Sequence, residues 1–330
     1  MEDLASRYVK HGFLDLSVSK DILEKIFEYR VLIDEDPCEK NNLNVSDQYT
    51  PHINKINSAV ELEKPIVMIL PAFPGKSPNR KKTLGAMPDL AEREALAKLH
   101  ELCTSIKSIY PPGAKVLICS DGYCFADIVH ISDEDILDYS NIIKSEIRDK
   151  YSETVGFFDL TDAFDHTTNF DLLREELMVL YAESMSVLKD KCKHDKFANA
   201  MFKGITRFLL EDYSGLSLYG SFSRNAIQQQ AKKNAARVIQ RSNAWSRLLE
   251  NLYPEAVRLS IHPQFSVSEK IGIRLVESHD NWLTPWHSVA IKLNEKVVLA
   301  KRSDVDEEKY ALVFKKGHPS HFELSRSANQ

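Results

Sequence analysis

The stretch Lys64-Pro65-Ile66-Val67-Met68-Ile69-Leu70-Pro71 decides the fold class of this chain of 330 residues. Its centre, residues 66–70, is a continuous apolar run between two prolines. A run this short, with no polar face, is typical of a strand buried on both sides, as in a sheet covered by helices. We therefore expect an interior strand at 66–70.

The segments that follow alternate between helix and strand patterns. Apolar residues recur at helical spacing from Leu96 to Ile109, after a proline at position 88 that suits a first helical turn. Pro111-Pro112-Gly113 ends that pattern, and further strands are predicted at 115–119 and 157–160. Strands that alternate with helices predict a mostly parallel sheet flanked by helices, which is the α/β class.

The two ends of the chain have different patterns. Ser19 begins a predicted helix, and residues 34–58 are polar enough to predict a long irregular connection. Residues 171–253 are predicted to be mostly helical. Later strands are expected at 257–262, 272–276, 288–293, 297–300 and 310–314, the last of them as antiparallel hairpins at a sheet edge or in a small β subdomain.

This organisation suggests three parts. Residues 1–60 form an N-terminal helix and irregular segment, and residues 61–293 form the catalytic α/β domain. Residues 294–330 form a C-terminal β-hairpin or edge segment that packs on the same domain.

Composition excludes several classes of function. There are 43 Lys and Arg against 48 Asp and Glu, a net charge of −5, which argues against a protein that coats nucleic acid. Glycine occurs 11 times and never as G-x-G, so the dinucleotide fingerprint and the kinase glycine loop are both absent.

The cysteines indicate a reducing compartment. Their number, 5, is odd, and no C-x-x-C occurs, so free or buried thiols are expected rather than a disulfide framework or a zinc site. The first ten residues lack an apolar signal region, and no apolar stretch is long enough to span a membrane. We expect a cytoplasmic protein that binds neither membrane nor nucleic acid.

The loop after residues 66–70 is the first candidate site. Lys76, Arg80, Lys81 and Lys82 follow a predicted strand end, where α/β proteins bind ligands, and they suit a phosphate or a carboxylate. A P-loop is excluded because Leu70 stands where that motif needs glycine. The alternative is a solvated basic turn.

The second candidate is Ser120-Asp121-Gly122, with Asp127 shortly after it. It again follows a strand end, where an aspartate can orient an amine or move a proton. An ordinary Asp-Gly turn is the alternative, since such turns are common and need no function.

Two histidine motifs form the third and fourth candidates. On a strand, Arg258, Ser260 and His262 share one face, and structural ion pairing is the alternative interpretation. In Thr284-Pro285-Trp286-His287, a proline and an aromatic residue hold a histidine rigidly, and a histidine packed in the core is the alternative. Arg237 and Arg241, four residues apart, present one cationic helix face that solvation alone would explain.

These motifs together resemble a known family. The string from Ile69 to Arg80 resembles the isonitrile (isocyanide) synthases, the family of the pyoverdine/paerucumarin and dityrosine biosynthesis enzymes. The resemblance extends in order over roughly residues 65 to 290. Further matching segments are Gly85 with Pro88-Asp89 and Glu92, 110–114, 120–127, 241–245, 258–263 and 284–289.

The resemblance implies a Rossmann-like fold and an enzyme without a cofactor. Such enzymes convert the α-amine of an aromatic amino acid, tyrosine or tryptophan, to an isonitrile whose carbon comes from C2 of ribulose 5-phosphate. It also implies a siderophore-related or other secondary metabolic pathway, with an iron/2-oxoglutarate oxygenase as the downstream partner.

This chemistry needs a phosphate clamp, acid and base groups, and a partner for the amino-acid carboxylate. Lys76, which could instead form a Schiff base with the ketone, is grouped with Asp121, His262 and His287 as catalytic. The remaining candidates bind substrate or phosphate: Arg80, Lys81, Ser120, Asp127, Arg241, Arg258, Ser260 and Trp286.

Two other functions remain open on the residues alone. One is another phosphosugar-dependent transferase or lyase on the same scaffold, and the other is a non-enzymatic module whose basic helix binds an acidic partner. A metal hydrolase is disfavoured because His262, His279 and His287 lack the spacing of metal ligands.

Overall fold

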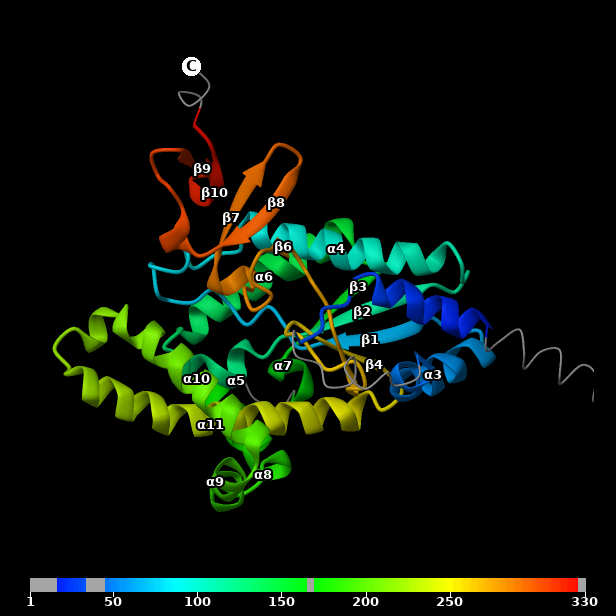
Figure 1. Cartoon of the computed structure of the whole chain (residues 1–330), viewed down its shortest axis with the longest axis horizontal. Helices are drawn as coiled ribbons and strands as arrows, with labels where there is room; N and C mark the ends of the chain where they lie inside the picture. Colours follow the sequence, from blue (N-terminus) through cyan, green and yellow to red (C-terminus); the bar gives the residue numbers. More distant parts are fainter. Residues whose placement is uncertain (1–16, 34–44, 165–168, 326–330) are drawn as a thin grey trace, which may run out of the picture.

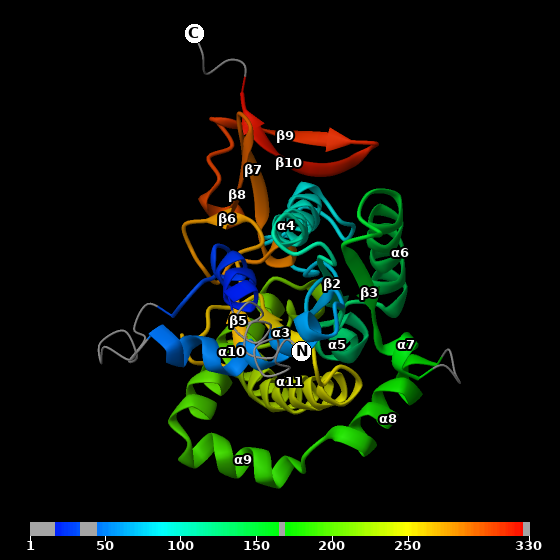
Figure 2. The same ribbon diagram turned by 90° about the vertical axis from the view of Figure 1, so that its right-hand side faces the viewer.

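The computed structural model describes residues 17–33, 45–164 and 169–325, without the side chains of 45–49. These residues form two five-stranded sheets with helices around them (Figure 1). The strands of the second sheet all follow those of the first in the sequence. In Figure 2, helix α4 lies between the two sheets.

The first sheet is parallel, with the strand order β3-β2-β1-β4-β5. The chain runs outward from β1 through β2 to β3 and then returns to place β4 on the other side of β1. The carboxyl ends of β1 and β4 therefore flank the topological switch point, where open α/β sheets bind ligands. Its strands are β1 (Ile66–Leu70), β2 (Ala114–Cys119), β3 (Val155–Phe158), β4 (Val257–Ser260) and β5 (Lys270–Gly272).

Helices cover both faces of this sheet, because successive side chains of a strand point to opposite faces. Met68 and Leu70 of β1 pack in one apolar cluster with α4, whereas Ile69 packs in another with Trp245 of α11. The helices are 17–27, α3 (Val45–Glu61), α4 (Leu90–Lys107), α5 (Gly122–Val129), α6 (Asp133–Lys150), α7 (Leu160–Ala163), α8 (Phe170–Tyr181), α9 (Met185–His194), α10 (Lys196–Ser214) and α11 (Arg224–Leu252), with short 3-10 turns η1 (Ser217–Tyr219), η2 (Pro285–His287) and η3 (Arg302–Asp304).

The second sheet is mixed, with the order β6-β8-β7-β10-β9. Its β7–β8 and β9–β10 pairs are antiparallel, and β7, β8 and β10 contact α4. The sheet therefore covers the helix that itself covers the first sheet (Figure 2). Its strands are β6 (Glu277–Ser278), β7 (Val289–Leu293), β8 (Lys296–Ala300), β9 (Tyr310–Lys315) and β10 (His318–Leu324).

The predicted fold class is confirmed: a parallel sheet flanked by helices, with antiparallel strands towards the C-terminus. The expected irregular segment was wrong for residues 45–58, which belong to α3. Ile56 and Val60 of α3 are buried in the core, and this apolar face stabilises the helix although Pro51 lies inside it. Residues 34–44, the rest of that segment, lie outside the described residues.

The division into three parts stays a prediction. The second sheet begins at β6 and includes β7, so its strands extend on both sides of the proposed boundary at 293/294.

Cysteines and apolar helices were the other features considered from the sequence. Cys103, Cys119, Cys124 and Cys192 are free thiols, and Cys38 lies outside the described residues. In the part of the chain that the structure describes, no helix is both long and apolar enough to cross a membrane.

Candidate functional site

The loop 71–83, which follows β1, is attached to the turn between β2 and α5. The Ser120 hydroxyl donates a hydrogen bond of 2.9 Å to the Phe73 carbonyl. Gly122 lies so close to this loop that a Cβ there would stand 2.5 Å from the Pro74 carbonyl oxygen. Close backbone packing thus requires glycine at position 122, and the preceding residue, Asp121, lies beside the loop.

The same loop is attached on its other flank to the segment 284–288. The Ser77 amide donates to the Trp286 carbonyl at 2.9 Å, and the Phe73 and Trp286 rings are 5.4 Å apart. Trp286 is buried, so its role here is packing that holds η2 against the loop. The loop therefore joins the carboxyl edge of the sheet to the turn that carries His287.

Lys76 lies at the centre of a buried ion-pair cluster. Its Nζ is 2.8 Å from Asp89 Oδ2 and 2.9 Å from Glu92 Oε2, and it donates to the Pro285 carbonyl at 2.8 Å. Burial alone would lower the pKa of Lys76, but the two carboxylates raise it overall. All three ammonium protons are engaged in this arrangement, so Lys76 links the loop to α4 and η2.

The two carboxylates come from the start of α4. Asp89 is the N-cap residue, and Glu92 closes a capping box by accepting from the Asp89 amide at 2.9 Å. Burial raises the pKa of Glu92 although Lys76 opposes it. The residues that begin the helix are therefore also those that hold the lysine.

Lys82 is paired differently, with residues of α10. Its Nζ is 2.7 Å from Asp212 Oδ1 and lies 4.7 Å from the centre of the Phe208 ring. Asp212 is buried and also accepts from the Ser77 hydroxyl at 3.4 Å. Helix α10 thereby holds the end of the loop 71–83, which we call the cationic loop, beside His287.

His262 and His287 lie close enough to interact electrostatically. The His287 ring is 4.8 Å from Phe208, at 74° to it, and its Nδ1 is 3.1 Å from the Thr284 hydroxyl. His262 follows β4 and its ring is 5.5 Å from that of Trp282, which is 59% exposed.

Surrounding protein lowers the pKa of both imidazoles. Desolvation lowers that of His262 to about 4, and desolvation followed by the charges of Lys82, His262 and Lys76 lowers that of His287 to about 3. Both histidines are therefore neutral at neutral pH, although His287 is partly exposed and His262 is exposed.

Asp121 lies at the same edge of the first sheet, and we call Asp121, His262 and His287, which all lie on segments at this carboxyl edge, the edge cluster. Asp121 follows β2, whose carboxyl end lies beside that of β1, and its side chain makes no capping hydrogen bond to α5. Desolvation raises the pKa of Asp121 to about 7. A carboxyl group that titrates near neutrality can take or give a proton at working pH, which makes Asp121 a candidate acid or base.

Arg258 and Ser260 make structural contacts on β4. The Arg258 guanidinium pairs with Glu250 and donates to the Ser246 hydroxyl, both on α11. The Ser260 hydroxyl accepts from the His262 amide at 3.1 Å and so supports that histidine. The shared strand face was expected, and ion pairing, the alternative interpretation, describes Arg258 in this structure.

The other proposed binding residues divide between the loop surface and α11. Arg80 and Lys81 are exposed, and Arg80 Nη1 donates to the Thr83 hydroxyl at 3.1 Å. Arg241 pairs with Asp127 and donates to the Cys124 carbonyl at 2.8 Å. The latter pair attaches α11 to α5, outside the edge cluster.

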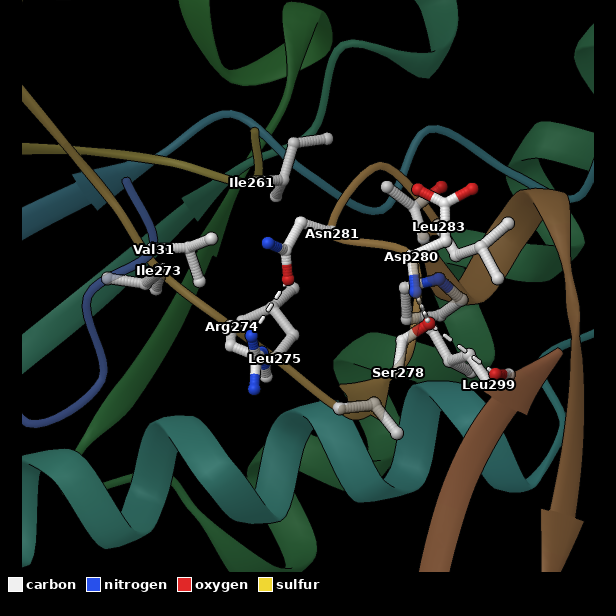
Figure 3. Close-up of a pocket in the computed structure, with 13 residues that line it drawn as sticks. Val31, Ile261, Ile273, Arg274, Leu275, Ser278, Asp280, Asn281, Leu283 and Leu299 are labelled. Carbon is white, nitrogen blue, oxygen red and sulfur yellow. Dashed lines mark hydrogen bonds between the residues drawn. The ribbon is translucent and has the colours of Figure 1, made fainter. Parts of the chain in front are cut away.

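A small pocket lies next to η2 (Figure 3). The segment 273–285 supplies most of its walls, together with Ile261, and Thr284 belongs to its lining. Figure 3 shows Arg274 and Asn281 pointing toward one another, and Arg274 Nη2 donates to Asn281 Oδ1 at 2.7 Å. The Arg274 guanidinium therefore already donates one hydrogen bond within the protein.

Sequence reasoning missed the contribution of α10. Phe208 and Asp212 belong to no recognised motif. Their spacing of four residues is that of neighbours on one helix face and does not mark them as site residues. Lys82 was predicted as part of the cationic run but was not among the final substrate-binding residues, and Thr284 was named only as part of the motif around His287.

A metal centre finds no support among the described side chains. Within residues 17–33, 45–164 and 169–325, no group of three or more His, Cys, Asp or Glu residues is arranged to hold a metal ion.

Known proteins match the chain over nearly its whole length. The pyoverdine/dityrosine biosynthesis protein family matches residues 56–313. An L-tryptophan isonitrile synthase of Fischerella ambigua is 43% identical over 306 residues, covering 92% of this chain and 91% of that protein. An L-tyrosine isonitrile synthase of Xenorhabdus nematophila is 40% identical over 320 residues, covering 95% and 93%.

Structural comparison agrees with the sequence matches. The crystal structure of the PvcA protein from Pseudomonas aeruginosa has a TM-score of 0.84 and 37% identity, covering 93% of this chain and 99% of that one. The family match includes the cationic loop, the edge cluster and η2. The chain therefore belongs to the pyoverdine/dityrosine biosynthesis protein family, as its motifs predicted.

Proposed function

We propose that the chain is an isonitrile synthase that acts on the α-amine of tyrosine or tryptophan and takes the isonitrile carbon from ribulose 5-phosphate. The observation that carries this proposal is the near full-length identity of 40–43% to proteins named L-tyrosine and L-tryptophan isonitrile synthases. The edge cluster supports it by supplying titratable groups at the carboxyl edge of the sheet, which contains the switch point.

The chemistry of the edge cluster suits a condensation between an amine and a ketone. The amine must lose a proton before it attacks, and Asp121, with its pKa raised to about 7 by desolvation, is our proposed base. The ketone oxygen must be polarised, for which neutral imidazoles and a nearby cation are suitable. His262, His287 and Lys82 provide these groups.

Aromatic side chains beside the histidines suit an aromatic substrate. Trp282 is largely exposed next to His262, and Phe208 contacts both His287 and Lys82. Their rings offer apolar surface with preferred stacking geometry. The exposed Arg80 and Lys81 remain our proposed contacts for the sugar phosphate.

Product analysis tests this function. Purified protein is incubated with tyrosine or tryptophan and ribulose 5-phosphate labelled with ¹³C at C2, with no metal or cofactor added. We expect an isonitrile that carries the label, detected by mass spectrometry, and competition between the two amino acids identifies the preferred one. Both amino acids recovered unchanged would refute the activity, and an unlabelled isonitrile would refute the carbon donor.

Other parts of the proposal concern the cell rather than the site. We propose that the enzyme needs no cofactor, works in the cytoplasm in secondary metabolism, and passes its product to an iron/2-oxoglutarate oxygenase. Retention of the isonitrile when that oxygenase is removed from the producing cell would support the order of the two steps.

A further inference from the structure

Thr284 and His287 form a rigid turn at the edge of the second sheet. The His287 amide donates to the Thr284 carbonyl at 3.0 Å, and the Ser288 hydroxyl donates to the same carbonyl at 2.7 Å. Pro285 between them fixes one backbone angle, and the β-branched Thr284 has few rotamers. The contact of 3.1 Å between the Thr284 hydroxyl and His287 Nδ1 is therefore held by the backbone on both sides.

A donating Thr284 hydroxyl fits the hydrogen-bond inventory of this side chain. Thr284 is 3% exposed, and a buried hydroxyl donates its proton to an acceptor. Among the residues that the structure describes, His287 Nδ1 is the partner of this hydroxyl. A donating hydroxyl requires Nδ1 to be unprotonated, and a neutral imidazole then carries its proton on Nε2.

The surroundings of His287 favour the neutral form that this assignment needs. Phe208 covers part of the ring without offering it an acceptor or a charge. Two charged groups that face His287 have their own counter-ions: Lys82 is paired with Asp212, and Lys76 is paired with Asp89 and Glu92. The neutral His262 also faces this ring.

We propose that Thr284 is a positioning residue that fixes His287 in the Nε2–H tautomer, so that the imidazole donates a hydrogen bond to a ketone or alkoxide oxygen of the substrate. The identity of that oxygen rests on the proposed function, whereas the tautomer rests on the contact between Thr284 and His287. It makes His287 an electrostatic stabiliser and leaves the role of base to another group, such as Asp121.

The test is nitrogen NMR of the full-length protein labelled with ¹⁵N-histidine, with the His287 signals assigned by their loss in His287→Gln. In the wild-type protein we expect Nε2 protonated and Nδ1 unprotonated. Thr284→Val keeps the side-chain shape but removes the hydroxyl, so the tautomers should mix, whereas Thr284→Ser should restore the wild-type signals. Thr104→Val, on the surface of α4 with its hydroxyl bonded to the His100 carbonyl, is the matched control and should change nothing.

Kinetics with ribulose 5-phosphate give the second readout. Thr284→Val should lower kcat by the factor by which the Nε2–H population of His287 falls, with little change in KM, and Thr284→Ser should recover most of the rate. A wild-type His287 with a protonated Nδ1 would overturn the proposal even if Thr284→Val failed to fold. An absent isonitrile product with the Nε2–H tautomer present would instead refute the proposed function alone.

Discussion

Lys76 contacts the segment 284–287 through the Pro285 carbonyl and His287 belongs to that segment, but the surroundings of the two residues shift their pKa values in opposite directions. Two buried carboxylates and a carbonyl surround Lys76, and the pKa of this lysine is raised. His287 meets cations and an aromatic ring, and burial with those cations lowers its pKa to about 3. A compensated buried charge serves the fold, whereas polar groups that are desolvated without a counter-ion are typical of catalytic sites.

The largest effect on this comparison is expected from Lys76→Met. Removal of the ammonium leaves Asp89 and Glu92 buried without a counter-ion, which costs about 3–5 kcal/mol in buried pairs. We expect the free energy of unfolding in urea to fall by about that amount. The double variant Lys76→Met/Glu92→Gln should recover part of the loss, since it removes one of the two stranded charges.

The opposite result would restore the catalytic role that the sequence suggested for Lys76. If Lys76→Met abolished turnover while its unfolding free energy stayed at the wild-type value, our distinction between the two regions would be wrong. Borohydride trapping with ribulose 5-phosphate would then show whether a Schiff base forms at this lysine.

The next largest effect is expected from His262→Gln and His287→Gln, which alter groups without ionic partners. Each should lower kcat about 100-fold or more, as expected for groups that donate or transfer protons in the reaction, with little change in unfolding free energy. His321→Gln is the matched control, because His321 is a buried histidine of the second sheet that bonds to Ser320 and Glu323. It should reduce stability and leave kcat unchanged, and the reverse pattern would place the reaction elsewhere.

Asp121→Asn sharpens the comparison through pH. Because desolvation raises the pKa of Asp121 to about 7, its basic form accumulates as pH rises through neutrality. We expect kcat/KM of the wild type to rise between about pH 6 and pH 8, and this rise to disappear in Asp121→Asn. Asp138→Asn, at an exposed position of α6, is the control. A rate that falls over the same range would make Asp121 an acid instead.

The parts of the fold that could be predicted depend on local patterns. The apolar run of β1 and the cap residues of α4 are local sequence signals that predict a strand and a helix start. The predicted strand ends placed Asp121 and His262 at the carboxyl edge of the sheet, where the structure has them. Residues 45–58 were misread because Pro51 and polar residues outweighed an apolar face that only the core explains. The second sheet was predicted in outline, without β6 and β10.

The partners of the site residues could not be predicted, since they come from distant parts of the chain. Ser77 and Asp212 are 135 positions apart, and Lys76 and the Pro285 carbonyl are 209 apart. A sequence with four cations in one loop does not show which are compensated. The same limit applies to Arg258, whose strand face was predicted correctly and whose pairing with Glu250 decides its role.

The smallest effect is expected at His52, a buried histidine outside the edge cluster. Burial and then the charge of Lys55 lower its pKa to about 4, against an ordinary value of 6.5. The unfolded chain therefore binds a proton below pH 6.5 that the folded protein refuses until about pH 4. The stability that His52 contributes is complete above pH 6.5, falls as pH decreases, and levels off below about pH 4.

From these two pKa values, the loss at pH 5 is about 2 kcal/mol relative to neutral pH. Urea unfolding of the wild type and of His52→Gln at pH 7 and pH 5 measures it, and the variant should lose less stability between the two. The kcat of His52→Gln at pH 7 should stay at the wild-type value, because His52 lies outside the edge cluster. Its burial should therefore affect only stability. A variant as acid-sensitive as the wild type would instead assign the acid sensitivity to other groups with lowered pKa values, which include His262 and His287.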